Sequence, residues 1–449
     1  SSATADFTNS GAGSGRITLG AAARVFDIGT SANMNVGWII ASTSTAGTLT
    51  KNGTGVLTLS GNNTYTGTTR INAGTLEITG SGRLGGGAYA AAISNNGSFI
   101  IGSNNNQTLS GIISGTGSLT KNGSGVLTLS GNSTYSGDTV INTGTLQIAT
   151  TGRLGAGNYS GNITNTGDFV FGSTSNQTLS GIISGTGSLT KNGTGKLSLS
   201  GSNTYSGTTT INTGTLEITS TGLLGGGNYS GDITNKGNFL YRSDSNQILS
   251  GVISGNGSLT TNGTGTLSLS GNNTYNGTTT ITAGTLEIAA TGRLNGGNYS
   301  GNISNSGSFI IGSTNNQTLS GIISGTGSLT KNGSGVLTLS GNSTYSGATA
   351  INAGTMKLGT NGSISSSSAV SIASGAVFDT TSKSSFAIGT AGITIGVDIS
   401  GAGFLTSNSI TLGNGLTISM GTTTPLGTYN LWDTTGTVSG NFVTVNLQG

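Results

Sequence analysis

Residues 51–61 read KNGTGVLTLSG, and the same pattern returns at residues 121, 191, 261 and 331, with Thr261 replacing the lysine in the fourth copy. The interval is the same each time, without an insertion or a deletion, and defines a 70-residue repeat. Such strict internal repetition is typical of a solenoid, in which one unit cannot bury a core alone and stacks on its neighbours. It also argues against an enzyme, because a catalytic site is usually built only once.

Within each period, apolar and polar residues alternate as they do in β-strands. In the second copy Leu127 and Leu129 share one face, and Val126 and Thr128 share the other. Gly-containing pairs between these runs supply the positive-φ positions that tight corners need, and helical periodicity is absent. The period divides into three pieces, each the length of one solenoid turn: 118–144, 145–167 and 168–187. We therefore predict an all-β fold, a right-handed parallel β-helix (β-solenoid) with about three turns per 70-residue repeat.

The repeat divides the chain into three parts. Residues 1–46 are expected to form lead-in turns or an N-terminal cap, and residues 47–358 a solenoid of four full repeats and one partial repeat. Residues 359–449 are expected to form irregular turns or a C-terminal cap. In this last part, alternating apolar residues predict strands at 370–372, 392–399, 409–412, 416–419 and 442–447.

Composition excludes several classes of function. The 449 residues contain no cysteine and no histidine, which removes disulfides, the usual zinc ligands and Ser-His-Asp or Cys-His catalysis. A net charge of +3 over so long a chain is too weak to indicate a nucleic-acid partner. The longest bulky apolar cluster, at residues 38–40, is far below the ~20 residues of a membrane helix. We expect no catalytic, metal or cofactor site, no nucleic-acid partner and no membrane insertion by this chain.

Residues 117–148, GSLTKNGSGVLTLSGNSTYSGDTVINTGTLQI, resemble the passenger-associated transport repeat of bacterial autotransporters. The shared features are Thr-Lys-Asn-Gly, then Leu-x-Leu-Ser-Gly-x-x-Thr-Tyr-x-Gly, then Ile-Asn-x-Gly-Thr-Leu. The copies begin at Gly47, Gly117, Gly187, Gly257 and Gly327. The resemblance implies a secreted or surface-displayed parallel β-helix from a bacterium with an outer membrane. The family repeat carries no catalytic residues, so none are implied here.

The resemblance also implies a C-terminal membrane barrel, and here the sequence departs from it. Residues 359–449 are too few for a twelve-strand barrel, which needs alternating segments of ~10 residues many times over. The chain starts at Ser1 without methionine and ends Leu-Gln-Gly. We expect a processed chain from which a barrel was removed, or a protein that uses the repeat without one.

Four series of side chains recur with the repeat. Lysines and arginines are expected to solvate turns and discourage wrong lateral pairing, with a sparse ladder for anionic polysaccharide as the alternative. Tyrosines are expected to pack across corners with their hydroxyls in water, with stacking on sugar rings as the alternative. Asn52, Asn72 and their copies are expected to form polar stacks at corners. The first three series are Lys51, Lys121, Lys191 and Lys331; Arg83, Arg153 and Arg293; and Tyr65, Tyr135, Tyr205, Tyr275 and Tyr345.

Other patterns carry no expected chemistry. Glu77, Glu217 and Glu287 should lie at equivalent outward positions ~14 Å apart, farther than the paired acids of a glycosidase. Residues 80–85 satisfy a dinucleotide fingerprint without a following helix, and GTGK at 193–196 lacks the rest of a phosphate loop. Both are interpreted as solenoid corners. Threonine-rich runs, such as 208–210, fit ordinary strand propensity better than an ice-binding face.

The leading functional hypothesis is a non-catalytic extracellular structural protein. It would associate with itself, head-to-tail or laterally, into a surface fibre, filament, sheath or matrix, because solenoid ends offer unpaired strand edges. The alternative is an autotransporter-type adhesin or self-aggregation passenger displayed on the outer membrane, with surface glycans as candidate partners. A polysaccharide-active enzyme and an ice-binding solenoid are the more distant alternatives.

Overall fold

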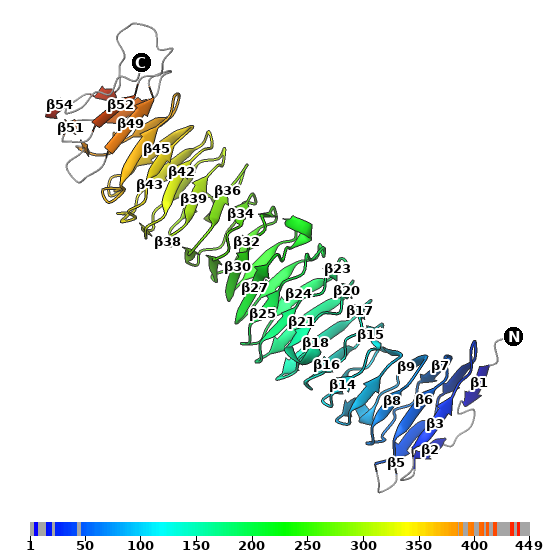
Figure 1. Cartoon of the computed structure of the whole chain (residues 1–449). Helices are drawn as coiled ribbons and strands as arrows, with labels where there is room; N and C mark the ends of the chain where they lie inside the picture. Colours follow the sequence, from blue (N-terminus) through cyan, green and yellow to red (C-terminus); the bar gives the residue numbers. More distant parts are fainter. Residues whose placement is uncertain are drawn as a thin grey trace. The chain divides into compact units, whose positions relative to one another are not determined.

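The computed structural model describes residues 15–19, 23–42 and 46–384, together with the backbone of strand β1 and of strands β48 to β54. The chain falls into two compact units, Ser1–Gly226 and Gly227–Gly449. Within each unit the strands follow one another as successive turns of a coil (Figure 1). In both units the described strands pair in parallel with strands one turn earlier and one turn later. The prediction of an all-β parallel solenoid is confirmed. No helix in the part of the chain that the structure describes is long and apolar enough to cross a membrane.

Three sheets form the body of the first unit. The first contains β1 (Thr4–Phe7), β4 (Asn33–Val36), β7 (Val56–Leu59), β9 (Thr75–Gly80), β12 (Ser98–Ser103), β15 (Ser118–Lys121), β17 (Thr139–Ile141), β20 (Ile163–Asn165) and β23 (Ile183–Ser184). The second contains β10 (Ala88–Tyr89), β13 (Gln107–Leu109), β16 (Val126–Leu129), β18 (Thr145–Thr150), β21 (Asp168–Ser173), β24 (Ser188–Lys191) and β26 (Thr209–Ile211). The third contains β19 (Asn158–Tyr159), β22 (Gln177–Leu179), β25 (Leu197–Leu199) and β27 (Thr215–Ser220).

Smaller sheets complete the first unit near its N-terminus. One pairs β3 (Arg24–Asp27), β6 (Leu49–Asn52), β8 (Thr69–Ile71), β11 (Ile93–Asn95) and β14 (Ile113–Ser114). Another pairs β2 (Arg16–Leu19) with β5 (Ile39–Ser42). Short 3-10 turns mark one corner of each repeat: η1 (Gly85–Gly87), η2 (Gly155–Gly157), η3 (Gly225–Gly227) and η4 (Asn295–Gly297).

The second unit has the same construction. One run of strands is β28 (Asn228–Tyr229), β31 (Gln247–Leu249), β34 (Thr266–Leu269), β36 (Thr285–Ile288), β39 (Ser308–Ile311), β42 (Ser328–Lys331), β44 (Thr349–Ile351), β46 (Ala369–Ile372), β49 (Thr394–Asp398) and β52 (Leu416–Ser419). Another is β37 (Asn298–Tyr299), β40 (Gln317–Leu319), β43 (Val336–Leu339), β45 (Thr355–Leu358), β47 (Val377–Asp379), β50 (Phe404–Ser407) and β53 (Trp432–Thr434). The remaining strands are β29 (Ile233–Asn235), β32 (Ile253–Ser254), β30 (Asn238–Ser243), β33 (Ser258–Thr261), β35 (Thr279–Ile281), β38 (Ile303–Asn305), β41 (Ile323–Ser324), β48 (Phe386–Ile388), β51 (Ile410–Leu412) and β54 (Val438–Gly440).

The register shows how the repeat maps onto the coil. Val126 pairs with Thr145 on the next turn, and Thr139 pairs with Ile163 over a longer loop. Within the 70-residue repeats one turn therefore takes from 19 to 24 residues, as the contacts between successive turns show. A 70-residue repeat covers slightly more than three such turns, so the equivalent strands β9, β18 and β27 lie in three different sheets of the first unit. Identical positions of successive repeats do not stack in one straight column, contrary to the simple ladder that the sequence suggests.

The core is built as the alternation predicts. In β16 the side chains of Leu127 and Leu129 are buried, and those of Val126 and Thr128 are half-buried on the outer face. Columns of inward residues from adjacent turns fill the interior, and each buried Leu, Ile or Phe contributes about 1.5–3 kcal/mol. Because every turn contributes only a few such side chains, the fold depends on stacking many turns.

Corners depend on glycine and asparagine. Gly185 has φ 102°, and a Cβ atom there would lie 2.1 Å from the carbonyl oxygen of Asn165 on the turn below, so only glycine fits. At another corner Asn72 donates an amide hydrogen bond of 2.8 Å to Asn52, and Asn142 donates one of 2.7 Å to Asn122. The predicted polar asparagine stacks are therefore confirmed at these corners.

Regular pairing continues past the last full repeat. Strands β46, β49, β51 and β52 match four of the five strands predicted after residue 358. The fifth, at 442–447, lies outside the described residues. The boundaries at residues 46 and 358, with the lead-in and cap roles assigned beyond them, stay predictions.

Candidate functional site

The recurring lysines are buried, which corrects the expectation that they solvate turns. Lys51, Lys121, Lys191 and Lys331, here called the corner lysines, expose at most 1% of their surface. Each stands at an inward position in its strand, so its ammonium group lies inside a corner. Lys51 Nζ donates to the carbonyl oxygens of Asn52 and Gly53, both at 2.8 Å, and to that of Ala73 at 3.3 Å. These side chains satisfy backbone carbonyls and cannot form a ladder for an external polysaccharide.

Burial lowers the pKa values of the corner lysines. Desolvation lowers the pKa of Lys121, of Lys191 and of Lys331 to about 8, because the charged form loses its hydration. Lys51 shows the same direction, and the nearby Asp27 carboxylate partly opposes the fall in its pKa. In the fourth repeat Thr261 fills the position, and its hydroxyl donates to the Ala283 carbonyl at 3.5 Å. A neutral side chain can therefore occupy this corner, which indicates a structural role.

The recurring tyrosines are also buried. Their hydroxyls were expected to lie in water, but they lie in the interior. The Tyr135 hydroxyl is hydrogen-bonded to Thr139 Oγ1 at 2.8 Å, and Thr139 Oγ1 is hydrogen-bonded to the Tyr159 hydroxyl at 2.7 Å. The two rings meet edge to face with centroids 5.4 Å apart. Burial raises the pKa of Tyr135 to about 12. We call this arrangement the tyrosine–threonine cluster; it recurs at Tyr65, Thr69 and Tyr89 and at Tyr275, Thr279 and Tyr299.

Sequence reasoning missed the second tyrosine of each cluster. The signal was present as a Tyr that follows the first at a constant interval in every full repeat: Tyr89, Tyr159, Tyr229 and Tyr299. Because the tyrosines of both series are buried, they cannot stack on sugar rings.

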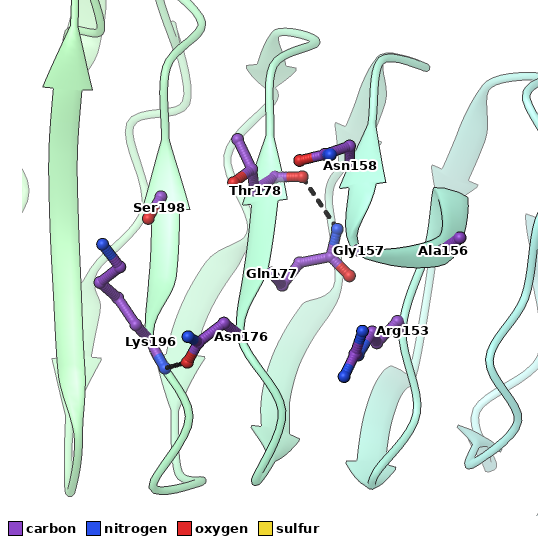
Figure 2. A pocket seen from close by; sticks show the side chains of 9 residues that line it. All are labelled: Arg153, Ala156, Gly157, Asn158, Asn176, Gln177, Thr178, Lys196 and Ser198. Atoms are coloured by element: carbon purple, nitrogen blue, oxygen red, sulfur yellow. Dashed lines mark hydrogen bonds between the residues drawn. The ribbon is translucent and has the colours of Figure 1, made fainter.

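A shallow polar pocket of about 320 Å³ lies over β19, β22 and β25 of the first unit (Figure 2). Arg153 and the turn η2 border it on one side, and Lys196 and Ser198 border it on the other. Its remaining lining residues are Ala156, Gly157, Asn158, Asn176, Gln177 and Thr178. The pocket is therefore lined by cationic and neutral polar groups from three consecutive turns.

Two of the lining side chains are fixed by backbone contacts. Gln177 is buried; its Oε1 accepts from the Leu154 backbone N–H at 2.8 Å, and its Nε2 donates to the Leu154 and Thr178 carbonyl oxygens. Asn176 Oδ1 accepts the backbone N–H of Lys196 at 2.9 Å. These amides hold the floor of the pocket in place and leave the outer groups to meet a ligand.

An ion pair sets one wall of this pocket. Lys196 Nζ lies 2.7 Å from Glu217 Oε2, and Ser198 donates a 2.6 Å hydrogen bond to the same oxygen. The Glu217 side chain is 3% exposed, whereas that of Lys196 is 40% exposed. Because the carboxylate is enclosed, loss of the lysine would leave a buried charge without its cation, which is strongly destabilising.

The structure brings together only some of the residues singled out in the sequence. Arg153 and Lys196, expected at separate corners, border one pocket. Glu77 and Glu217 lie in different sheets, so the expectation of a column with ~14 Å spacing is wrong for these two residues. Residues 80–85 connect β9 to the 3-10 turn η1, as a corner. Of the threonine-rich run 208–210, Thr209 is buried and Thr210 half-buried, so the run is not one exposed face.

Among the described residues, no group of three or more His, Cys, Asp and Glu side chains could hold a metal ion. None of the residues that line the pocket is a carboxylate, and Glu217, which pairs with Lys196 at its wall, is engaged by a lysine and a serine. The arrangement can bind a polar or anionic group, and its described residues place no second carboxylate for acid–base hydrolysis.

Comparison with known protein families agrees with the repeated solenoid architecture. Five segments match the family described as passenger-associated-transport-repeat, at residues 49–78, 119–148, 189–218, 259–288 and 329–358. The chain therefore carries five copies of this passenger repeat. The resemblance seen in the sequence is thereby confirmed, and the matched segments include Lys51 and Glu217 but not Arg153.

A curated protein with a sequence similar to this chain is named adhesin BmaC autotransporter, from Brucella suis biovar 1 (strain 1330). The two sequences are 31% identical over 479 aligned positions, which cover 77% of this chain and 14% of that protein. The chain thus spans about one seventh of its relative's length. No solved structure matches the chain.

Proposed function

We propose that this chain is a segment of a non-catalytic, adhesin-type passenger that acts at the bacterial surface or in the extracellular space. The observation that carries the proposal is the combination of five passenger repeats with homology to an autotransporter named as an adhesin. The polar pocket of the first unit supports it, since it offers binding groups without the paired acids of a hydrolase.

An adhesion assay tests this proposal. Fluorescent microspheres coated with the purified chain should attach to cultured animal cells at several times the level of albumin-coated microspheres. Microspheres coated with the acid-unfolded chain serve as the control for nonspecific protein coating. Attachment of the folded chain no greater than that of albumin would refute the adhesin proposal.

Self-association into a fibre, filament, sheath or matrix is the second proposal. It is supported by the low surface charge, because only 6% of the residues are charged and the corner lysines are withdrawn into the interior. In the first unit Ile112 and Ile182 are 46% and 42% exposed, and such side chains favour contact between copies. Copies could meet laterally or head-to-tail.

Electron microscopy across a concentration series distinguishes the two arrangements. Filaments that lengthen with concentration support head-to-tail association, and side-by-side bundles support lateral association. Single particles at every concentration would refute self-association without bearing on adhesion.

A further inference from the structure

The pocket of the first unit differs chemically from the same location in other repeats. Position 196 is a lysine, whereas the equivalent residues of other copies are Val126, Thr266 and Val336. In the second repeat Gln147 also stands where Glu217 stands in the third. The Lys196–Glu217 pair is therefore a local addition to a repeat that folds without it.

The charges at this location leave an excess cation. Lys196 is paired with Glu217, but the Arg153 guanidinium makes no hydrogen bond or ion pair with any described residue. The side chain of Arg153 lies beside Gly157, where a Cβ atom would be 3.4 Å from Cδ and 3.6 Å from Nη1. Glycine at this position, with φ 104°, keeps the space beside the guanidinium open.

Neutral groups around the cation suit a sugar. Asn158 is exposed and Thr178 half-buried, so their polar side chains remain available at the surface of the pocket. Gly157 and Ala156 add a small apolar surface against which a ring face can rest. A volume of about 320 Å³ is at the small end of ligand pockets and admits one sugar unit of a longer chain.

We propose that this pocket binds an anionic sugar unit of a polysaccharide, with its acidic group held by Arg153. Guanidinium presents a planar fork of donors that matches a carboxylate or sulfate, and the second cation adds attraction from the opposite wall. Asn158 and Thr178 bind the sugar hydroxyls. This inference rests on the proposed adhesin function and names the ligand class that the pocket selects.

Binding of defined oligosaccharides to the full chain tests the proposal. Isothermal calorimetry with trigalacturonate should give a dissociation constant in the millimolar range or tighter, and neutral galactotriose should bind at least 10-fold more weakly. Binding of a sulfated galactan trisaccharide shows whether the pocket requires a carboxylate or accepts any anionic group. Raising the salt concentration should weaken the acidic ligands only.

Variants locate the site. Arg153→Gln should weaken trigalacturonate binding by about 10-fold or more, as expected for loss of a charged hydrogen bond. The matched control is Arg83→Gln, at the equivalent position of the preceding repeat, which should leave binding unchanged. The double variant Lys196→Val with Glu217→Gln copies the Val126 and Gln147 combination, so it should fold. It should bind trigalacturonate several-fold more weakly than the unaltered chain does.

The outcomes separate this inference from the adhesin proposal. Equal binding of acidic and neutral sugars, no binding of either, or equal loss in the Arg83 variant would overturn the pocket assignment. If microspheres carrying Arg153→Gln still attach to cells as the unaltered chain does, adhesion stands and the pocket is not its basis. If the unaltered chain fails to attach while still binding trigalacturonate through Arg153, the adhesin proposal fails and the sugar site stands.

Discussion

Replacing Thr139 by valine should destabilise one tyrosine–threonine cluster. The side chain is 1% exposed, and its hydroxyl bridges the hydroxyls of Tyr135 and Tyr159 at 2.8 and 2.7 Å. Valine has nearly the same shape, so the substitution removes the two hydrogen bonds without opening a cavity. Any change in stability therefore reports on the polar cluster itself.

The magnitude follows from which hydroxyl loses its partner. Tyr159 keeps a hydrogen bond to the Gly137 carbonyl oxygen, so its hydroxyl remains satisfied. Tyr135 is fully buried; its hydroxyl would lose the hydrogen bond to Thr139 and keep the neighbouring Tyr159 hydroxyl as its remaining partner. Two buried hydrogen bonds are lost while each tyrosine hydroxyl keeps one partner, so we expect a loss of about 1–2 kcal/mol.

Native-state hydrogen exchange is the assay, because turns of a solenoid open locally. The free energy of opening for amides in β17 and its neighbours should fall by about 1–2 kcal/mol. The control is Thr210→Val, since Thr210 is half-buried on the outer face and Val140 occupies the equivalent position of the preceding repeat. The control substitution should change the free energy of opening by less than about 0.5 kcal/mol. An equal effect of the two substitutions would refute the reasoning.

Three further predictions follow from the corners and the ion pair. The corner lysines with a pKa of about 8 have a higher pKa when unfolded, so the unfolded chain binds more protons and stability should rise from about pH 8 to pH 10. Above about pH 10 it should fall, because tyrosines with raised pKa values ionise first in the unfolded chain; urea unfolding at a series of pH values measures both limbs. Gly185→Ala should cost about 3 kcal/mol or more in thermal or urea unfolding, and a result below about 1 kcal/mol would contradict the close approach to Asn165. Lys196→Val alone should cost about 3 kcal/mol by leaving the Glu217 carboxylate buried without its cation, and adding Glu217→Gln should recover most of that loss.

The sequence by itself determined the class of fold. Alternation such as that of Leu127 and Leu129 places side chains on two faces of a strand whatever lies around it, and the 70-residue repeat forces turns to stack. The asparagine stacks were also readable, since Asn52 and Asn72 stand one turn apart and equal side chains pair across a parallel register.

Only the tertiary structure decided which polar residues are buried. Lys51 and Thr139 are residue types that are common at protein surfaces, but each occupies an inward position of its strand. Each has a hydrogen-bond partner on an adjacent turn, which is Ala73 for Lys51 and Tyr159 for Thr139. The position of such partners depends on turn lengths that vary along the coil and that no local pattern fixes. The same uneven turn length places equivalent strands in different sheets and brings Arg153 and Lys196, distant in the sequence, to one pocket. The register between turns, a property of the folded coil, therefore set the candidate site.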